Sequence, residues 1–244
     1  MSVVNKMTEK VNGVTLKAVN YKDSDRILTV LTLERGKITV SARGVRKANA
    51  KMKQISEPFC FAESILAEKS GRFTVTEINS FDAFYPIRTD VTKYYAGMTA
   101  LEVTDAFLPD GLESAGHFVL LVEFLKKLAY KSVNPINLLL KFFYDVAKEN
   151  GYTITFEGCG RCYEEIKNKV YLSLKDGCCV CESCKKQGEN GFSIETYNYL
   201  KKIESGNLED FDRETSKNCL RFWGYYLARV ATVNLRCLTM LVDL

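Results

Sequence analysis

The sequence predicts an α+β protein in which a small β-barrel comes first and helices follow. Short segments of alternating apolar and polar residues fill residues 10–80, and from about residue 89 the apolar residues recur at helical spacing. A cluster of cysteines interrupts the helical part. We therefore expect a barrel domain over residues 1–80 and a helical domain over residues 81–244, with a cysteine-rich insert at about 156–188.

Five strands are expected in the barrel, separated by turn sequences such as Glu34–Gly36 and Lys69–Arg72. Five short strands in about 70 residues suit a small closed barrel, and the five-stranded OB-fold is the most economical choice. The strand pattern alone also permits an SH3-like barrel. The expected strands cover residues 14–19, 26–33, 37–42, 59–66 and 73–78.

The helical part contains five expected helices. The third begins with a favourable cap, Asn134 followed by Pro135, and ends at Asn150-Gly151. The expected helices cover residues 89–108, 114–130, 135–149, 193–203 and 213–241.

Composition limits the possible functions. With 46% hydrophobic and 26% charged residues, the chain can bury a core. The first 14 residues lack the apolar stretch of a signal peptide, and the most apolar run, residues 118–128, is interrupted by charges. We therefore expect a cytoplasmic protein without a membrane segment. The single histidine, His117, lies in an apolar helical run and is expected to be structural.

The cysteines predict a metal site. Cys159 and Cys162 form one Cys-x2-Cys pair, and Cys181 and Cys184 form a second after 18 intervening residues. This spacing is typical of structural zinc, because two tight turns bring four thiolates to one tetrahedral ion. The segment between the pairs reads as a hairpin that turns at Asp176-Gly177, so the layout is that of a zinc ribbon.

Two alternatives remain open at the cysteines. Cys178 and Cys181 are also spaced Cys-x2-Cys, but that pairing leaves the returning strand almost no residues, so we favour Cys181 and Cys184. A degenerate site without metal is the other alternative. A catalytic zinc is disfavoured, since four thiolates leave no coordination position for water. We expect one structural Zn²⁺.

Positive charge is concentrated in residues 35–53, which contain seven cations and no acid; the remainder of the chain is mildly acidic although the net charge is +4. Repeated cations on a barrel and its adjoining loop can neutralise successive phosphates without reading sequence. The alternative is an ordinary solvated face. Tyr21, Phe59 and Phe73 are candidates for base stacking only if the fold brings them to these cations, and core packing is favoured for both phenylalanines. We name the seven cations the basic strip: Arg35, Lys37, Arg43, Arg46, Lys47, Lys51 and Lys53.

The N-terminal residues resemble the signature of the bacterial RecO family of recombination mediators. Residues 17–32, KAVNYKDSDRILTVLT, carry the resemblance together with Arg35-Gly36-Lys37 and the segment ARGVRK at 42–47. The order of barrel, helices and four-cysteine module also matches. Two positions depart from the family pattern: Arg35 stands where the family often has histidine, and Tyr163 where it often has glycine after the second cysteine.

The resemblance implies a function without covalent chemistry. Such proteins bind single- and double-stranded DNA, anneal complementary strands, engage the tail of single-stranded-DNA-binding protein (SSB), and with RecR help to load RecA onto SSB-coated strands. The implied location is the cytoplasm, at the nucleoid, and no small-molecule substrate is expected. Common motifs for phosphate loops, metalloproteases and serine hydrolases are absent from the sequence, which also disfavours an enzyme.

The tail of SSB, which is acidic and ends in apolar residues, needs an apolar pocket with a cationic rim. We expect this pocket in the helical domain, where several cations adjoin apolar helix faces: Lys126, Lys127, Lys201, Lys202 and Arg221. An alternative function for the whole chain is a zinc-ribbon factor acting in transcription or complex assembly.

Overall fold

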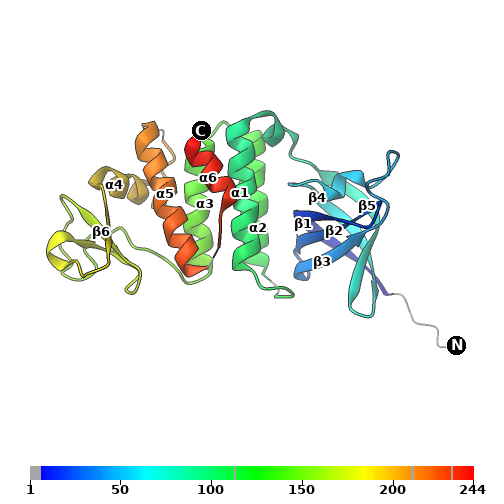
Figure 1. Cartoon of the computed structure of the whole chain (residues 1–244), viewed down its shortest axis with the longest axis horizontal. Helices are drawn as coiled ribbons and strands as arrows, with labels where there is room; N and C mark the ends of the chain where they lie inside the picture. Colours follow the sequence, from blue (N-terminus) through cyan, green and yellow to red (C-terminus); the bar gives the residue numbers. More distant parts are fainter. Residues whose placement is uncertain (1–6, 113, 210–211, 232) are drawn as a thin grey trace. The chain divides into compact units, whose positions relative to one another are not determined.

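In the computed structural model, the N-terminal part of the chain forms a closed five-stranded barrel (Figure 1). Its strands are β1 (Met7–Tyr21), β2 (Asp25–Thr32), β3 (Gly36–Ala42), β4 (Phe61–Lys69) and β5 (Arg72–Asp82). They follow the order β1-β2-β3-β5-β4, and β4 pairs back onto β1. Only the contact between β3 and β5 is parallel. The OB-type barrel predicted from the alternating segments is confirmed.

The structure describes residues 7–112, 114–209, 212–231 and 233–244, so the first six residues of the predicted barrel domain lie outside the described part. Among the described residues, none of the helices combines the length and the apolar character needed to cross a lipid bilayer.

Alternation along the strands places one set of side chains inside the barrel. Leu28, Val30, Val40 and Leu66 are among the buried residues of this core. The strand β1 is longer than expected because its first half pairs with β4 and its second half with β2, with a register shift between Thr15 and Lys17. The strand β1 therefore pairs with both β2 and β4, and this double pairing closes the barrel.

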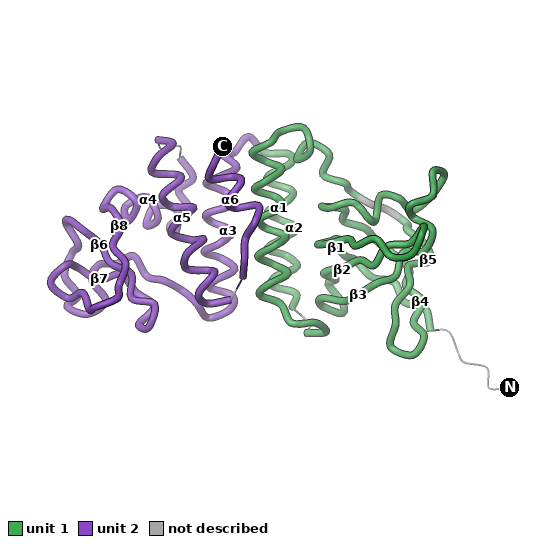
Figure 2. The backbone as a smooth tube through the Cα atoms, viewed as in Figure 1, with its two compact units in different colours: residues 1–131 green, residues 132–244 purple. Residues whose placement is uncertain are grey.

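Two helices follow the barrel in the same compact unit, residues 1–131 (Figure 2). They are α1 (Val91–Phe107) and α2 (Ala115–Tyr130), and α1 packs against both α2 and β1. Asp90 caps α1 by accepting a hydrogen bond from the backbone N–H of Lys93. The domain boundary predicted at residue 80 stays a prediction, since one compact unit can contain more than one domain.

The second compact unit, residues 132–244, contains the remaining helices and a small sheet. Its helices are α3 (Pro135–Glu149), α4 (Ile194–Glu204), α5 (Arg213–Val230) and α6 (Arg236–Asp243). The Asn134 side chain caps α3 by accepting from the N–H groups of Ile136 and Asn137, as the Asn-Pro pair predicts. Helices α3, α4 and α5 pack against one another, and the buried Trp223 of α5 contacts the rings of Phe143 and Tyr144 on α3.

The C-terminal helix predicted over residues 213–241 is wrong in one respect: it is two helices, with α5 ending at Val230 and α6 starting at Arg236. The separating sequence, residues 231–235, contains Val233 followed by Asn234, which are weak helix formers.

The cysteine-rich insert folds around an antiparallel sheet of order β7-β6-β8. The strands are β6 (Val170–Ser173), β7 (Cys178–Cys181) and β8 (Asn190–Phe192), with Ser173 paired to Cys178 at the hairpin. The predicted hairpin is confirmed, and β8 adds a third strand that the sequence did not indicate. We call residues 155–192 the cysteine module.

Candidate nucleic-acid interface and metal centre

Five members of the basic strip lie in the segment between β3 and β4. Residues 43–60 include only one short 3₁₀ turn (Lys53–Ser56), and the side chains of the five cations are all exposed. The structure therefore places these charges on one irregular segment, residues 43–60, which we call the basic loop. They are Arg43, Arg46, Lys47, Lys51 and Lys53.

The start of this loop is held against the turn between β1 and β2. The backbone N–H of Arg46 donates to the carbonyl of Ser24 at 3.0 Å, and its guanidinium donates to the carbonyl of Lys22 at 3.1 Å. The N–H of Gly44, whose φ of 67° lies in the left-handed region, donates to the Asp25 carboxylate at 2.8 Å. Lys22, which the sequence analysis did not single out, thus joins the cations of the loop.

The end of the loop is held by Arg26. Its guanidinium donates to the Ser56 carbonyl at 2.8 Å and contacts the Glu57 carboxylate at 3.3 Å. Asp25 and Arg26, which are adjacent at the start of β2, therefore fix the two ends of a loop of irregular backbone. The cations between these points are presented by a supported loop, which reduces the entropy lost when they meet a ligand.

The other two members of the strip are placed differently. The ammonium of Lys37 donates to the carbonyl and carboxylate of Asp105 at 2.7 and 2.9 Å, and its side chain is only 10% exposed. The Arg35 guanidinium pairs with Glu9 at 2.6 Å. Lys37 thus joins β3 to the end of α1, and both charges have carboxylate partners within the first unit.

The fold separates the three aromatic candidates. Phe59 is fully buried, and Phe73 packs against the barrel core. Tyr21 is 49% exposed at the end of β1, beside the turn on which the basic loop rests. Core packing is confirmed for Phe59. Phe73 is only partly buried, and the Arg35 guanidinium lies 5.9 Å from its ring centre, so Phe73 and Tyr21 both lie next to cations.

Replacing Asp25 by alanine is expected to loosen the basic loop, because the Gly44 N–H loses its acceptor. That hydrogen bond holds the pKa of Asp25 below its usual value, so its stabilisation is present above a pH near 3.8 and is lost as pH falls through the lower value of the folded state. Amide hydrogen exchange at Gly44 should accelerate in Asp25→Ala at neutral pH. The matched control is Asp23→Ala, which alters an exposed aspartate of the same turn; equal protection of Gly44 in both variants would contradict this assignment.

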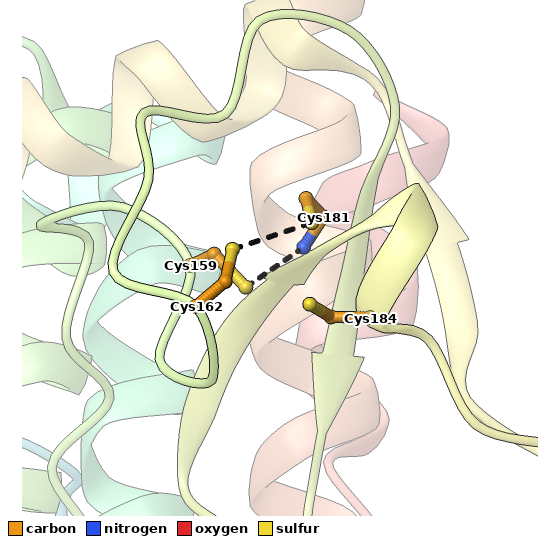
Figure 3. A group of neighbouring side chains, drawn as sticks. All are labelled: Cys159, Cys162, Cys181 and Cys184. Carbon is orange, nitrogen blue, oxygen red and sulfur yellow. Dashed lines mark hydrogen bonds between the residues drawn. The ribbon is translucent and has the colours of Figure 1, made fainter.

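The four predicted cysteines form one cluster. Cys159 and Cys162 lie on the loop before β6, Cys181 ends β7, and Cys184 lies in the short 3₁₀ turn that follows (Figure 3). Their sulfur atoms lie within 4.8 Å of one another, and the Sγ atoms of Cys162 and Cys181 are 3.8 Å apart. Four thiolates bound to zinc at about 2.3 Å would be about 3.8 Å apart, so the donor set fits a tetrahedral ion.

Backbone N–H groups favour the thiolate form of Cys159, which is the most buried of the four clustered cysteines. Burial opposes ionisation of Cys159, but N–H groups of Cys162, Cys181 and Arg161 point toward its sulfur and together lower its pKa to about 6. By contrast, hydrogen bonds to the neighbouring thiols raise the pKa of Cys184 to about 12. Four thiolates therefore require a positive charge among them, which is what a bound metal ion supplies.

Arg161, which lies between Cys159 and Cys162 in the sequence, links three parts of the cysteine module. Its guanidinium donates to Asp176 at 2.7 Å, to Glu189 at 2.5 Å and to the carbonyl of Cys184 at 2.7 Å. The pKa of Glu189 is lowered to about 2, chiefly by the hydrogen bond from Arg161. One side chain thus connects the first cysteine pair, the hairpin turn and the second pair.

Cys178 packs against Gly160, which lies between Cys159 and Cys162 in the sequence, and it is not one of the four clustered cysteines. It is buried at the start of β7, and a side chain at Gly160 would place its Cβ 2.7 Å from the Cβ of Cys178. This close packing explains a glycine between Cys159 and Cys162. Cys178 therefore acts as a packing residue in this arrangement.

Tyr163 stands in a strained conformation. Its φ of 64° lies in the left-handed region, and its side chain is 86% exposed. Its backbone N–H donates to the carbonyl of Cys159 at 2.8 Å, which closes the first turn. Left-handed backbone favours glycine, the residue expected here from the family resemblance.

Tyr163→Gly is expected to stabilise the cysteine module by about 0.5–1 kcal/mol, because the glycine removes the steric cost of the left-handed backbone. The measurement is thermal unfolding of the metal-loaded protein. Tyr163→Ala serves as the control, since it removes the exposed ring but keeps Cβ. If Tyr163→Ala stabilised the module as much as Tyr163→Gly, the exposed ring and not the left-handed backbone would be the cause of the wild-type protein's lower stability.

Cations suggested for a peptide site lie in different places. Lys126 faces solvent on α2 and lies 3.6 Å from Glu123, and Lys127 is exposed beside it. Lys201 and Lys202 border an open cavity between α4 and the start of α5. Arg221 borders a separate cavity of about 350 Å³ whose apolar lining includes Phe192, Phe222 and Tyr225. This last cavity combines three aromatic residues with a cation.

The barrel with its supported basic loop and the helical region with its four-cysteine cluster define an OB-type barrel protein whose C-terminal part has a cysteine cluster suited to a metal ion. Comparison with known families gives a match to "Recombination protein O N terminal" over residues 7–84 and to "Recombination protein O C terminal" over residues 88–236. The chain therefore belongs to the RecO family.

Individual relatives agree with this assignment. "DNA repair protein RecO" of Clostridium perfringens is 29% identical over 206 residues, which cover 83% of this chain and 82% of the relative. The protein of the same name from Pelobacter propionicus is 30% identical over 204 residues, covering 82% and 81%. That of Caldicellulosiruptor bescii is 26% identical over 204 residues, covering 84% and 83%. The similarity extends over the barrel and the helical part alike.

Proposed function

We propose that this protein is a recombination mediator that binds single- and double-stranded DNA through the exposed part of the basic strip. The observation that carries the proposal is the supported loop, which presents four exposed cations between its attachments at Gly44 and Ser56 and a fifth, Arg43, directly before Gly44. Such a surface contacts phosphates of any sequence. Arg43, Arg46, Lys47, Lys51 and Lys53 are its principal contacts. Arg35 and Lys37 contribute less, because their charges already face carboxylates.

Strand annealing follows from the same surface. Two complementary strands repel each other through their phosphates, and a cationic protein surface lowers this repulsion while the bases find their partners. No bond is made or broken by the protein in such a role. We accordingly propose a function without covalent catalysis, exercised at the nucleoid in the cytoplasm.

The proposed protein partners are SSB, RecR and, indirectly, RecA. Support for an SSB-tail site comes from the cavity beside Arg221, because an apolar pocket with a cationic rim suits an acidic peptide that ends in apolar residues. Arg229, a second cation on α5, lies 5.2 Å from the ring centre of Tyr225, which lines the cavity, although Arg229 is not one of the lining residues. RecR and RecA follow from the family resemblance alone.

One zinc ion is the proposed occupant of the cysteine cluster. Cys159, Cys162, Cys181 and Cys184 would hold it, with all four positions taken by thiolates. Its contribution is to stabilise the module and to neutralise the crowded sulfurs, since no coordination position remains for a substrate.

An annealing assay on SSB-coated complementary strands tests the mediator function. Labelled single strands are coated with SSB from the same source as the protein, mixed, and followed for duplex formation with increasing protein. We expect duplex to form much faster than with SSB alone. Arg221→Glu should reduce annealing of coated strands while leaving annealing of naked strands unchanged. Failure of the wild-type protein on coated and naked strands alike would refute the proposal.

A further inference from the structure

The outer face of the barrel carries a row of residues that crosses four strands. Val19 of β1 pairs with Ile27 of β2, Ile27 pairs with Ser41 of β3, and Ser41 pairs with Thr74 of β5. Paired residues share one face of a sheet. The neighbouring positions Leu28 and Val40 belong to the barrel core, so this row faces outward (strands β1–β3 in Figure 1).

Apolar side chains gather on this outer face at the end of β1. Val19 is 52% exposed, and Tyr21, two residues further along the same face, is 49% exposed. Ile27, the cross-strand partner of Val19, is partly exposed. We call Val19, Tyr21 and Ile27 the outer patch. Single exposed apolar residues are ordinary, whereas three adjoining ones on an outer sheet face indicate a contact surface.

Cations border the outer patch at both ends. The ammonium of Lys22 lies 5.3 Å from the ring centre of Tyr21, and Arg46 donates to the carbonyl of Lys22. Arg43 follows directly on the last residue of β3. At the other end, Lys17 is exposed on the same face as Val19, two residues before it. Asp25, the cross-strand partner of Tyr21, also lies at this end, where its carboxylate accepts from the N–H of Gly44. The apolar surface therefore has cations at both ends and one carboxylate that is already hydrogen-bonded, an arrangement complementary to a flexible polyanion that carries apolar faces.

We propose that the outer patch binds unpaired bases of single-stranded DNA, with Tyr21 as the stacking residue, while the basic loop holds the adjoining phosphates. Bases in a duplex are stacked on one another and offer only their edges, whereas those of a single strand can place a face on an aromatic ring. The cations alone hold both forms of DNA; the outer patch adds affinity for the single strand. This inference rests on the proposed DNA binding by the basic strip.

An abasic oligonucleotide separates the two contributions, since it keeps the phosphates and lacks the bases. Binding of labelled 20-residue oligothymidylate, of an abasic strand of equal length and of a 20-base-pair duplex is measured by fluorescence anisotropy at fixed salt. Wild-type protein should bind oligothymidylate more tightly than the abasic strand. Tyr21→Ala should lose about tenfold in affinity for oligothymidylate, and little for the other two probes.

Two further variants make the result specific. Tyr21→Phe keeps the ring and should retain the wild-type affinities. Tyr85→Ala removes another exposed tyrosine of the same unit, 68% exposed, and should change none of them. Equal affinities of wild type and Tyr21→Ala for oligothymidylate would overturn the base site while leaving phosphate binding intact. Absence of binding to all three probes by the wild type would instead refute the proposed function itself.

Discussion

Arg43→Glu combined with Arg46→Glu is expected to lower the affinity for every DNA probe by about ten- to a hundredfold at low salt. Both side chains are exposed, and reversing two charges removes about two phosphate contacts and adds repulsion. The slope of log affinity against log salt should therefore become shallower by about 2. Titrations at several salt concentrations, with oligonucleotides of unrelated sequence, measure both quantities. Because the proposed contacts are to phosphates, the loss should be the same for each sequence.

A matched control keeps the change in net charge and moves it elsewhere. Lys167 and Lys175 are exposed in the cysteine module, and Lys167→Glu with Lys175→Glu makes the same change of four charge units. The control should bind DNA within about twofold of the wild type, because screening limits the effect of distant charges. Equal losses in the two double variants would mean that net charge governs binding, and the basic loop would then not be the site.

The barrel could be predicted because its information is local. Alternation marks which residues face the core, and the turn sequences mark where strands end, so four of the five strands begin and end within about four residues of their expected positions. Two features depend on contacts distant in sequence. The long β1 pairs with two different strands, and the third strand of the cysteine module, β8, is only three residues long. Neither leaves a periodic pattern.

The candidate sites were predictable to different degrees. Cys-x2-Cys spacing directly encodes a geometry, and the four expected sulfurs do converge. The number of cations in a segment does not say where each side chain lies in the folded protein. It could not separate Lys37, which is buried against Asp105, from the exposed cations of the loop. Nor could it show that Tyr21 lies beside the cations, since the hydrogen bonds from Arg46 to the turn at Lys22 create that proximity.

Cys159→Ser is expected to abolish metal binding and to unfold the cysteine module. Cys159 is 1% exposed, and its sulfur accepts from the N–H of Cys181 at 3.4 Å, so it is the least replaceable of the four ligands. Zinc per chain should fall from about one to near zero by elemental analysis. The lost binding energy is part of the folding energy of the module. We expect the thermal midpoint to fall by about 10 °C or more, corresponding to a few kcal/mol.

Cys178→Ala and Cys184→Ser together decide which cysteine completes the site. Cys178 packs beneath Gly160, so its replacement should leave one zinc per chain and lower stability by about 1 kcal/mol through lost packing. Cys184→Ser should behave like Cys159→Ser in zinc content, because its sulfur belongs to the group of four. The reverse pattern, with zinc retained in Cys184→Ser and lost in Cys178→Ala, would transfer the fourth ligand to Cys178. Zinc-free wild-type protein, purified without chelator, would refute the metal site altogether and leave Arg161 as the principal support of the module.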